Sequence, residues 1–211
     1  MFDLTQTPMT LLLLIVNVVV SLYTLSRRPQ LLDQLAFRPE RILRHGELYR
    51  LITAGFVHVN GTRLLVNMLT LYFFGPWLEV TLGPIGYLIV YFGSELAAHT
   101  LALIIQRDNT QYSAVGASGA ITGVLFAFCL FEPFRLLYLF FVVPIPAIIF
   151  AVGFVAISMM AMQNRGFNQT GGLAHEAHLG GAIGGVVITI LLDPAALPMF
   201  LHQLARILHR T

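Results

Sequence analysis

A serine and a histidine, each followed by glycine in an apolar segment, are the residues of this chain best suited to chemistry. Ser118 lies in the sequence Gly-Ala-Ser-Gly at residues 116–119, and His178 lies in Ala-His-Leu-Gly-Gly at residues 177–181. A neutral imidazole, whose ordinary pKa is about 6.5, can take a proton from a serine hydroxyl near neutral pH. The two residues therefore indicate a nucleophile and its general base, placed where bulk water is scarce.

The neighbours of Ser118 fit a nucleophile. Gly116 and Gly119 leave room for another backbone, or a substrate, to approach the hydroxyl. Because Ser118 is predicted to begin a helix, the N–H groups near it lack intrahelical acceptors and could bind an oxyanion. Helix packing is the alternative, since small residues spaced in this way are common where membrane helices meet. The motif is not Gly-x-Ser-x-Gly, because residue 120 is alanine, so the soluble nucleophile-elbow fold is not supported.

The glycines after His178 predict a close helix contact. Gly181 and Gly185 follow it by three and seven residues, on the same helical face, so the histidine lies at the edge of that face. A hydrogen-bonded packing role for His178 is the alternative. His175 is expected to bond at the helix entry. A two-histidine metal site has only Glu176 to support it, so we expect neither a metal nor another cofactor.

Asn67 and Arg63 are the third element of the candidate site. A bare amide in hydrocarbon costs several kcal/mol, so Asn67 must find a partner, either across a helix interface or at a developing negative oxygen. Arg63 lies four residues earlier on the same helical face. One helix could therefore direct two hydrogen-bond donors to one place.

The composition indicates the class of protein in which these residues must be positioned. Hydrophobic residues make up 57% of the 211 residues and charged residues 10%, with a mean hydropathy of +0.79. Soluble domains carry about 25% charged residues, so this sequence predicts an integral membrane protein. A formal net charge of +2 is too small to indicate a nucleic-acid partner, and the single Cys129 excludes an intramolecular disulfide.

Six apolar segments are candidate membrane spans of an all-α, multi-pass bundle. Crossing the hydrocarbon core takes about 20 helical residues. The first segment is interpreted as an anchor rather than a cleaved signal peptide. Pro144 and Pro146 should kink the fifth segment or delay its start. Residues 26–49 mix leucines with arginines, which predicts an element in the membrane interface, with a solvated loop as the alternative. The six segments are residues 9–25, 62–80, 85–105, 116–131, 136–162 and 174–192.

Taken together, these motifs resemble the rhomboid family of intramembrane serine proteases. Each motif alone is weak, but their order along six apolar segments is specific. The resemblance covers about residues 46–193 of what we expect to be a single domain over 1–211. It rests on Glu47-Leu-Tyr-Arg-Leu-Ile-Thr, Phe56-Val-His, Asn67-Met-Leu-Thr-Leu-Tyr-Phe-Phe-Gly, Gly75-x3-Glu79-x3-Gly83, Gly116-x-Ser118-Gly119 and Ala177-His178-x2-Gly181-x3-Gly185.

The resemblance implies a role for each matching residue. Ser118 would be the nucleophile and His178 the general base of a dyad that has no aspartate. Asn67 and the Ser118 backbone N–H would form the oxyanion hole. His58 would be structural, bonding the first-loop region near the start of the second span, and Glu79 would tie down the loop after that span. The substrates would be single-span membrane proteins, cut near the external end of the helix, with lipids as the other partners.

Two positions depart from the family pattern. The family usually has a second oxyanion-binding histidine four residues before the asparagine, where this chain has Arg63. It often has an aromatic residue four positions after the serine, where this chain has Thr122. Arg63 could serve the oxyanion or extend to the interface instead. The departures support the alternative of a weak or inactive rhomboid-like pseudoprotease that binds transmembrane clients.

A third interpretation is a small transporter with Glu95 and His99 as its proton site. Packing between these two residues, four apart on one helix, is the simpler explanation, and no inverted repeat supports a transporter. The resemblance implies a cytoplasmic N-terminus, whereas the arginine distribution favours the opposite orientation. We expect a multi-pass protein of a bacterial inner membrane, and the sequence leaves its oligomeric state open.

Overall fold

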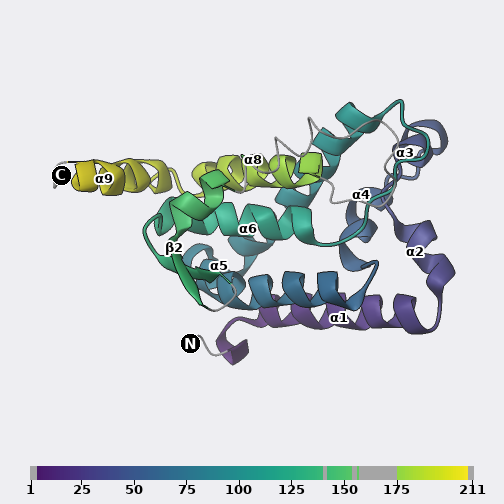
Figure 1. The fold of residues 1–211 in the computed structure, drawn as a ribbon, viewed down its shortest axis with the longest axis horizontal. Helices are drawn as coiled ribbons and strands as arrows, with labels where there is room; N and C mark the ends of the chain where they lie inside the picture. Colours follow the sequence, from purple (N-terminus) through teal and green to yellow (C-terminus); the bar gives the residue numbers. More distant parts are fainter. Residues whose placement is uncertain (1–3, 140–141, 154–155, 157–174, 209–211) are drawn as a thin grey trace.

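The computed structural model describes residues 4–139, 142–153, 156 and 175–208, and this part of the chain is mostly helical (Figure 1). Residues 147–153 are also helical, directly after the second strand. The elements are η1 (Leu4–Gln6), α1 (Pro8–Ser26), α2 (Pro29–Leu35), α3 (Pro39–His45), α4 (Arg50–Thr53), η2 (Ala54–Phe56), α5 (Gly61–Gln106), α6 (Ser118–Phe131), β1 (Leu136–Leu139), β2 (Val143–Pro146), α8 (His175–Leu192) and α9 (Ala196–Leu208).

Within the described residues, α1, α5 and α8 are long and apolar enough to cross a membrane. The 46 residues of α5 are two helices joined at Gly83, whose φ of 73° breaks the helical path just before Pro84. This break lies between the predicted segments 62–80 and 85–105, so both are helical as expected. α6 is a shorter apolar helix of 14 residues. The count of six spans stays a prediction.

The helix of the fifth segment does not begin at residue 136, and the alternative that Pro144 and Pro146 delay its start is confirmed. β1 and β2 instead pair antiparallel, Leu136 with Pro146 and Leu139 with Val143. Pro144 and Pro146 have no N–H to donate and a restricted φ, and two prolines so close together strongly disfavour a helix. The helix of the fifth segment begins at Ala147, directly after the second proline. Residues 157–162 of that segment lie outside the described part of the chain. α9 was not predicted from the sequence.

The core lies where α5, α6 and α8 pack together, and α1 packs along α5 (Figure 1). Tyr87 and Tyr91, in the second half of α5, are among the largest side chains that are fully buried. Leu71 and Leu78 of the first half join the same cluster, as does Val124 of α6. Ala117 and Ala120, at the start of α6, belong to this cluster. Ala177, at the start of α8, packs in a second cluster with Ala98 and Ala102 of α5.

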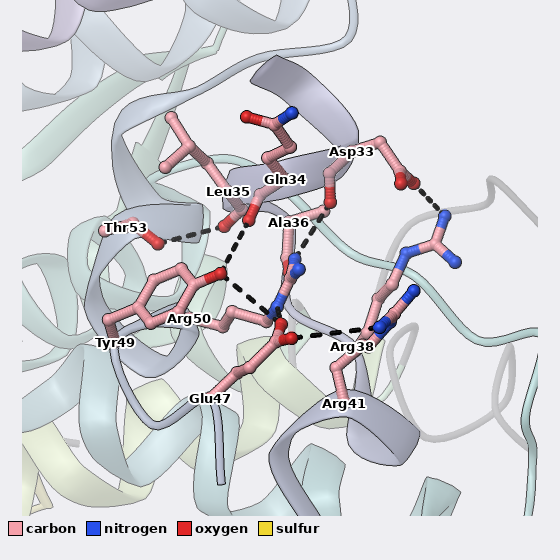
Figure 2. Close-up of polar contacts among 10 residues, drawn as sticks. All are labelled: Asp33, Gln34, Leu35, Ala36, Arg38, Arg41, Glu47, Tyr49, Arg50 and Thr53. Atoms are coloured by element: carbon pink, nitrogen blue, oxygen red, sulfur yellow. Dashed lines mark hydrogen bonds and ion pairs between the residues drawn. The ribbon is translucent and has the colours of Figure 1, made fainter. Parts of the chain in front are cut away.

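The first connection is folded rather than a plain loop, and Arg50 holds it together (Figure 2). The Arg50 side chain, 6% exposed, donates to the carbonyl oxygens of Asp33 and Ala36, at 2.8 Å each, and to the Glu47 carboxylate. Thr53 donates to the carbonyl of Leu35 at 3.0 Å. α2 and α4 are thus joined by hydrogen bonds to backbone carbonyls, which fix backbone positions.

Glu47 contacts several polar side chains of the same connection (Figure 2). It lies 3.8 Å from Arg41 and accepts from the Tyr49 hydroxyl at 3.3 Å. The hydrogen bond from Arg50 holds the pKa of Glu47 below its ordinary value. Leu43 and Leu48 are 56% and 63% exposed beside these charges. This surface suits the predicted position in the membrane interface, which stays a prediction.

Glu79, for which the resemblance implies a role in holding the loop after the second span, caps α1 in the structure. It is buried, and it accepts from the backbone N–H groups of Met9 at 3.0 Å and Thr10 at 2.7 Å, and from the Thr10 hydroxyl at 2.7 Å. The N-cap residue of α1, Thr7, makes no side-chain capping bond. The free N–H groups and positive dipole end of α1 therefore attract the carboxylate.

We expect Glu79→Ala to lower the free energy of unfolding by roughly 3 kcal/mol, because it leaves the donors at the start of α1 without an acceptor. Thermal unfolding in detergent would measure this loss. Glu40→Ala is the matched control: its ion pair with Arg44 is exposed, so the change should be below about 1 kcal/mol. Equal melting temperatures for the two variants would contradict the capping role.

Candidate active site

Ser118 and His178 meet across the contact between α6 and α8. The Ser118 Oγ lies 2.9 Å from the His178 Nε2. Ser118 is the first residue of α6 and is half-buried, and His178 lies in the first turn of α8 and is 6% exposed. The distance is that of a hydrogen bond between a hydroxyl and an imidazole nitrogen. The two residues that the sequence predicted to be nucleophile and base are thus in hydrogen-bonding contact.

Glycines allow this close approach of α6 and α8. A Cβ atom on Gly181 would overlap the backbone carbonyl of Gly119, and one on Gly185 would overlap that of Gly123. The neighbouring Gly180 has a similar function against α5, where an added Cβ would lie 2.7 Å from the carbonyl oxygen of Ala97. The predicted glycine face of α8 is therefore a backbone-to-backbone contact, and it fixes the separation of the helices that carry Ser118 and His178.

Backbone hydrogen bonds fix the segment that leads into Ser118. Phe37 and Ala114 form an isolated antiparallel bridge, with N···O distances of 2.9 and 3.1 Å. The N–H of Gly116 donates to the carbonyl of Ala54 at 2.9 Å. Gly116 has a φ of 117°, a backbone conformation that side chains with a Cβ rarely adopt. The chain can therefore turn sharply into α6, which explains the first glycine of the motif.

His58 connects α1, α5 and the approach to Ser118. Its Nδ1 lies 2.8 Å from the Ser21 Oγ, and its Nε2 lies 2.9 Å from the Asn67 Nδ2 and 3.5 Å from the Ala117 N. Burial, and to a smaller extent the charge of Arg63, lowers the pKa of His58 to about 4. The ring is therefore neutral at pH 7. Because its Nε2 accepts from Asn67 and Ala117, its proton lies on Nδ1 and is donated to Ser21.

Asn67 and Arg63 lie beside this network. A Cβ on Gly116 would be 3.7 Å from the Asn67 Nδ2, so the amide lies against the turn before Ser118. One of its two N–H groups is directed at His58, which leaves the second as a possible donor. Arg63 is half-buried near the start of α5, and no carboxylate among the described residues lies within 4 Å of its guanidinium. Its positive charge contributes to the lowered pKa of His58.

Two other polar residues near the pair have partners of their own. Glu176 is 3% exposed and accepts from the Gln106 Nε2 at 3.1 Å, so its carboxylate is bound to α5. Thr122 donates to the carbonyl of Ser118 at 2.6 Å, within the first turn of α6. The described residues contain no group of three or more His, Cys, Asp or Glu side chains that could hold a metal ion. The arrangement can support acyl transfer by a serine and a histidine.

Sequence reasoning missed the function of Glu95, which caps α6 instead of pairing mainly with His99. Its Oε2 accepts from the Ala120 N–H at 2.9 Å, whereas the His99 Nδ1 is 3.6 Å from its Oε1. His99 is bound elsewhere, with its Nδ1 2.7 Å from the carbonyl oxygen of Leu51 and its ring stacked on Phe37. The sequence signal for such a cap was Ala117, the residue before α6. Because an alanine side chain has no acceptor atom, the first N–H groups of the helix need an acceptor from elsewhere.

The comparisons with known proteins agree on one family. The model of the Rhomboid domain matches residues 45–194, most of the chain. RHOMBOID-like protein 12, mitochondrial, of Arabidopsis thaliana is 29% identical over 152 residues, which are 65% of this chain and 44% of that protein. The putative rhomboid protease YdcA of Bacillus subtilis is 36% identical over 91 residues, 43% of this chain and 45% of that protein.

A yeast protein adds a third relative. Rhomboid protein 1, mitochondrial, of Saccharomyces cerevisiae is 32% identical over 141 residues, which are 65% of this chain and 40% of that protein. The chain therefore spans less than half the length of these three relatives. Since two of them are mitochondrial by name, they do not support the predicted location in a bacterial inner membrane.

Proposed function

The chain belongs to the rhomboid family, and on that basis we propose that it is an intramembrane serine endopeptidase whose catalytic dyad is Ser118 and His178. The observation that carries the proposal is the 2.9 Å contact between the Ser118 Oγ and the His178 Nε2. The family and the apolar helices identify an integral membrane protein. Six spans and an interfacial first connection are part of the proposal.

The dyad would act by acyl transfer. His178 Nε2 takes the hydroxyl proton while the Ser118 Oγ bonds to the scissile carbonyl carbon. The negative oxygen then binds the Ser118 N–H and the free N–H of Asn67. His178 returns the proton to the leaving amine as the peptide bond breaks. His178 then takes a proton from a water molecule whose oxygen bonds to the acyl carbon, and it returns that proton to the Ser118 Oγ as the ester bond breaks.

His58 would hold the oxyanion donor in place. Its Nε2 accepts from Asn67 and from the Ala117 N–H, so one neutral ring joins the Asn67 amide to the residue before the nucleophile. Glu176 accepts from Gln106 through its Oε1, which binds it to α5. The glycine contact between α6 and α8 would help to orient His178, by fixing the path of the backbone that carries it.

The substrate would be the transmembrane helix of another membrane protein, opened near its external end. Ser118 is half-buried beside backbone, so only an extended segment can bring a carbonyl to its hydroxyl. We expect replacement of helix-weakening Gly or Pro residues near the cut site with Leu to slow cleavage by about tenfold, because unwinding then costs more. Gel assays in proteoliposomes would compare the two substrates. Faster cleavage of the stiffened substrate would contradict this account.

The same assay tests the alternative of a pseudoprotease. A protein that only binds clients would hold the unmodified substrate in the proteoliposomes and leave it intact over the full time course. The protease proposal requires that the wild-type protein cut it at a defined bond.

Arg63 is expected to assist the oxyanion in place of the histidine that is usual in the family. Arg63→Ala should lower kcat by roughly 10²-fold, and Arg63→His should recover part of that rate, because each donor to an oxyanion contributes about this much. Steady-state kinetics of the three proteins on one substrate measure this. If Arg63 extends to the interface instead, Arg63→Ala keeps the wild-type rate and Arg63→His exceeds it.

A further inference from the structure

Glu95 is a buried carboxylate that lies directly behind the nucleophile. It belongs to the second half of α5 and is 2% exposed. Its Oε2 accepts from the backbone N–H of Ala120, two residues after Ser118, at 2.9 Å. Its Oε1 lies 3.6 Å from the His99 Nδ1. The proposed hydrolysis uses neither oxygen.

The hydrogen bond from Ala120 replaces a cap that α6 lacks. Ala117 is the N-cap residue of α6 and makes no side-chain capping bond. An N-cap side chain ordinarily accepts from the second or third N–H of a helix, and Ala120 is the third residue of α6. Glu95 therefore caps the helix from another helix, 25 residues earlier in the chain. The N–H of Ser118, two residues before Ala120, is left for the substrate.

Two glycines make room for the carboxylate. A Cβ on Gly55 would lie 2.5 Å from the Glu95 Oε1, and a Cβ on Gly119 would lie 3.1 Å from its Oε2. The carboxylate is thus packed between η2 on one side and the first turn of α6 on the other. This contact joins the segment around Ala54, which also holds Gly116, to the helix that carries the nucleophile.

We propose that Glu95 is a positioning residue for Ser118. By accepting from the Ala120 N–H, it fixes the first turn of α6, and with it the distance from the Ser118 Oγ to the His178 Nε2. It touches neither the substrate nor the reacting atoms. The inference rests on the proposed protease function and assigns to that site a residue that neither the family motifs nor the Ser-His contact includes.

Four variants separate positioning from packing and from charge. Glu95→Met keeps the length of the side chain and removes the acceptor. Glu95→Gln keeps an acceptor oxygen in the same place and removes the charge. Glu95→Asp keeps the charge and withdraws the acceptor by one methylene. Asn17→Ala is the matched control, because Asn17 is an equally buried polar residue, hydrogen-bonded to Leu13 and Tyr91 in the packing of α1.

The measurement is kcat and KM for a single-span substrate in proteoliposomes. The concentration of active sites used to calculate kcat is the amount of protein that a fluorophosphonate labels at completion. Because a misplacement of about 1 Å can cost 10²-fold, we expect Glu95→Met and Glu95→Asp to lower kcat at least tenfold. Their KM should stay within about twofold, since Glu95 does not contact the substrate. Glu95→Gln and Asn17→Ala should keep kcat within about threefold of wild type.

Each result decides the proposal. Wild-type kcat in Glu95→Met, counted per labelled site, would overturn it and leave a packing role only. If Glu95→Met does not fold, the comparison of Glu95→Gln with Glu95→Asp decides: a more active Asp variant would mean that charge matters, and would overturn the proposal too. An inactive wild-type protein would instead overturn the protease function itself, which distinguishes the two failures.

Discussion

Cleavage of a single-span substrate is expected to fall by at least about 10⁴-fold when Ser118 is replaced by alanine, because the reaction loses its nucleophile while the fold is kept. Ser118 is half-buried at the start of α6, and removal of its Oγ leaves the glycine contacts of α6 with α8 unchanged. The measurement is the initial rate of product formation in proteoliposomes, with thermal unfolding as the check on the fold.

Ser26→Ala is the matched control for this variant. Ser26 ends α1, is exposed, and donates to the carbonyl of Leu22 in its own helix. We expect Ser26→Ala to cleave at the wild-type rate. Substantial residual cleavage by Ser118→Ala would mean that another group performs the attack, and the dyad would then be wrong.

The substitution Gly181→Ala, which adds a single methyl group, is expected to lower kcat/KM by about 10²-fold. This is the second largest effect that we expect. The Cβ of Gly181→Ala would overlap the backbone carbonyl of Gly119, one residue after Ser118. Backbone cannot move aside as a flexible side chain can, so α6 and α8 must separate. Since the two helices carry Ser118 and His178, a shift of about 1 Å between them is enough for such a loss.

Gly61→Ala is the control for that substitution, since no heavy atom lies within 4 Å of a Cβ built at Gly61. Its activity and melting temperature should match those of the wild-type protein. The melting temperature of Gly181→Ala should fall, since overpacking costs about 1–3 kcal/mol. An unchanged rate for Gly181→Ala would show that the separation of α6 and α8 does not control the dyad.

The helices of the site could be predicted because local chemistry marks their ends. Gly83 and Pro84 form a break that side-chain patterns alone locate, and the structure has its helix boundary there. The glycines after His178 predicted a close contact, and the structure places them against Gly119 and Gly123. In both cases the signal lies within a few residues of the feature.

The pairing of β1 with β2 could be predicted only in part. Pro144 and Pro146 disfavour a continuous helix, and they were expected to kink it or delay its start. Apolar content says nothing about which structure replaces the helix, because strands and buried helices can be equally apolar. The pairing of Leu136 with Pro146 depends on backbone hydrogen bonds between two strands, which hydropathy does not encode.

The two capping carboxylates could not be assigned from the sequence for a different reason. Glu79 caps α1 and Glu95 caps α6, across 69 and 25 residues of the chain. Sequence spacing shows which residues share a helical face, and this led to pairing Glu95 with His99. It does not show which helix start lies opposite a carboxylate, because that depends on how the helices pack.

The most direct test of the Ser-His dyad is fluorophosphonate labelling of the purified protein, with the modified residue identified by peptide mapping. The account predicts a covalent adduct on Ser118 in the wild-type protein. It predicts none in Ser118→Ala and a labelling rate at least about 10²-fold slower in His178→Ala, because the serine then lacks its base. Labelling of His178→Ala at the wild-type rate, or an adduct on another residue, would contradict the account.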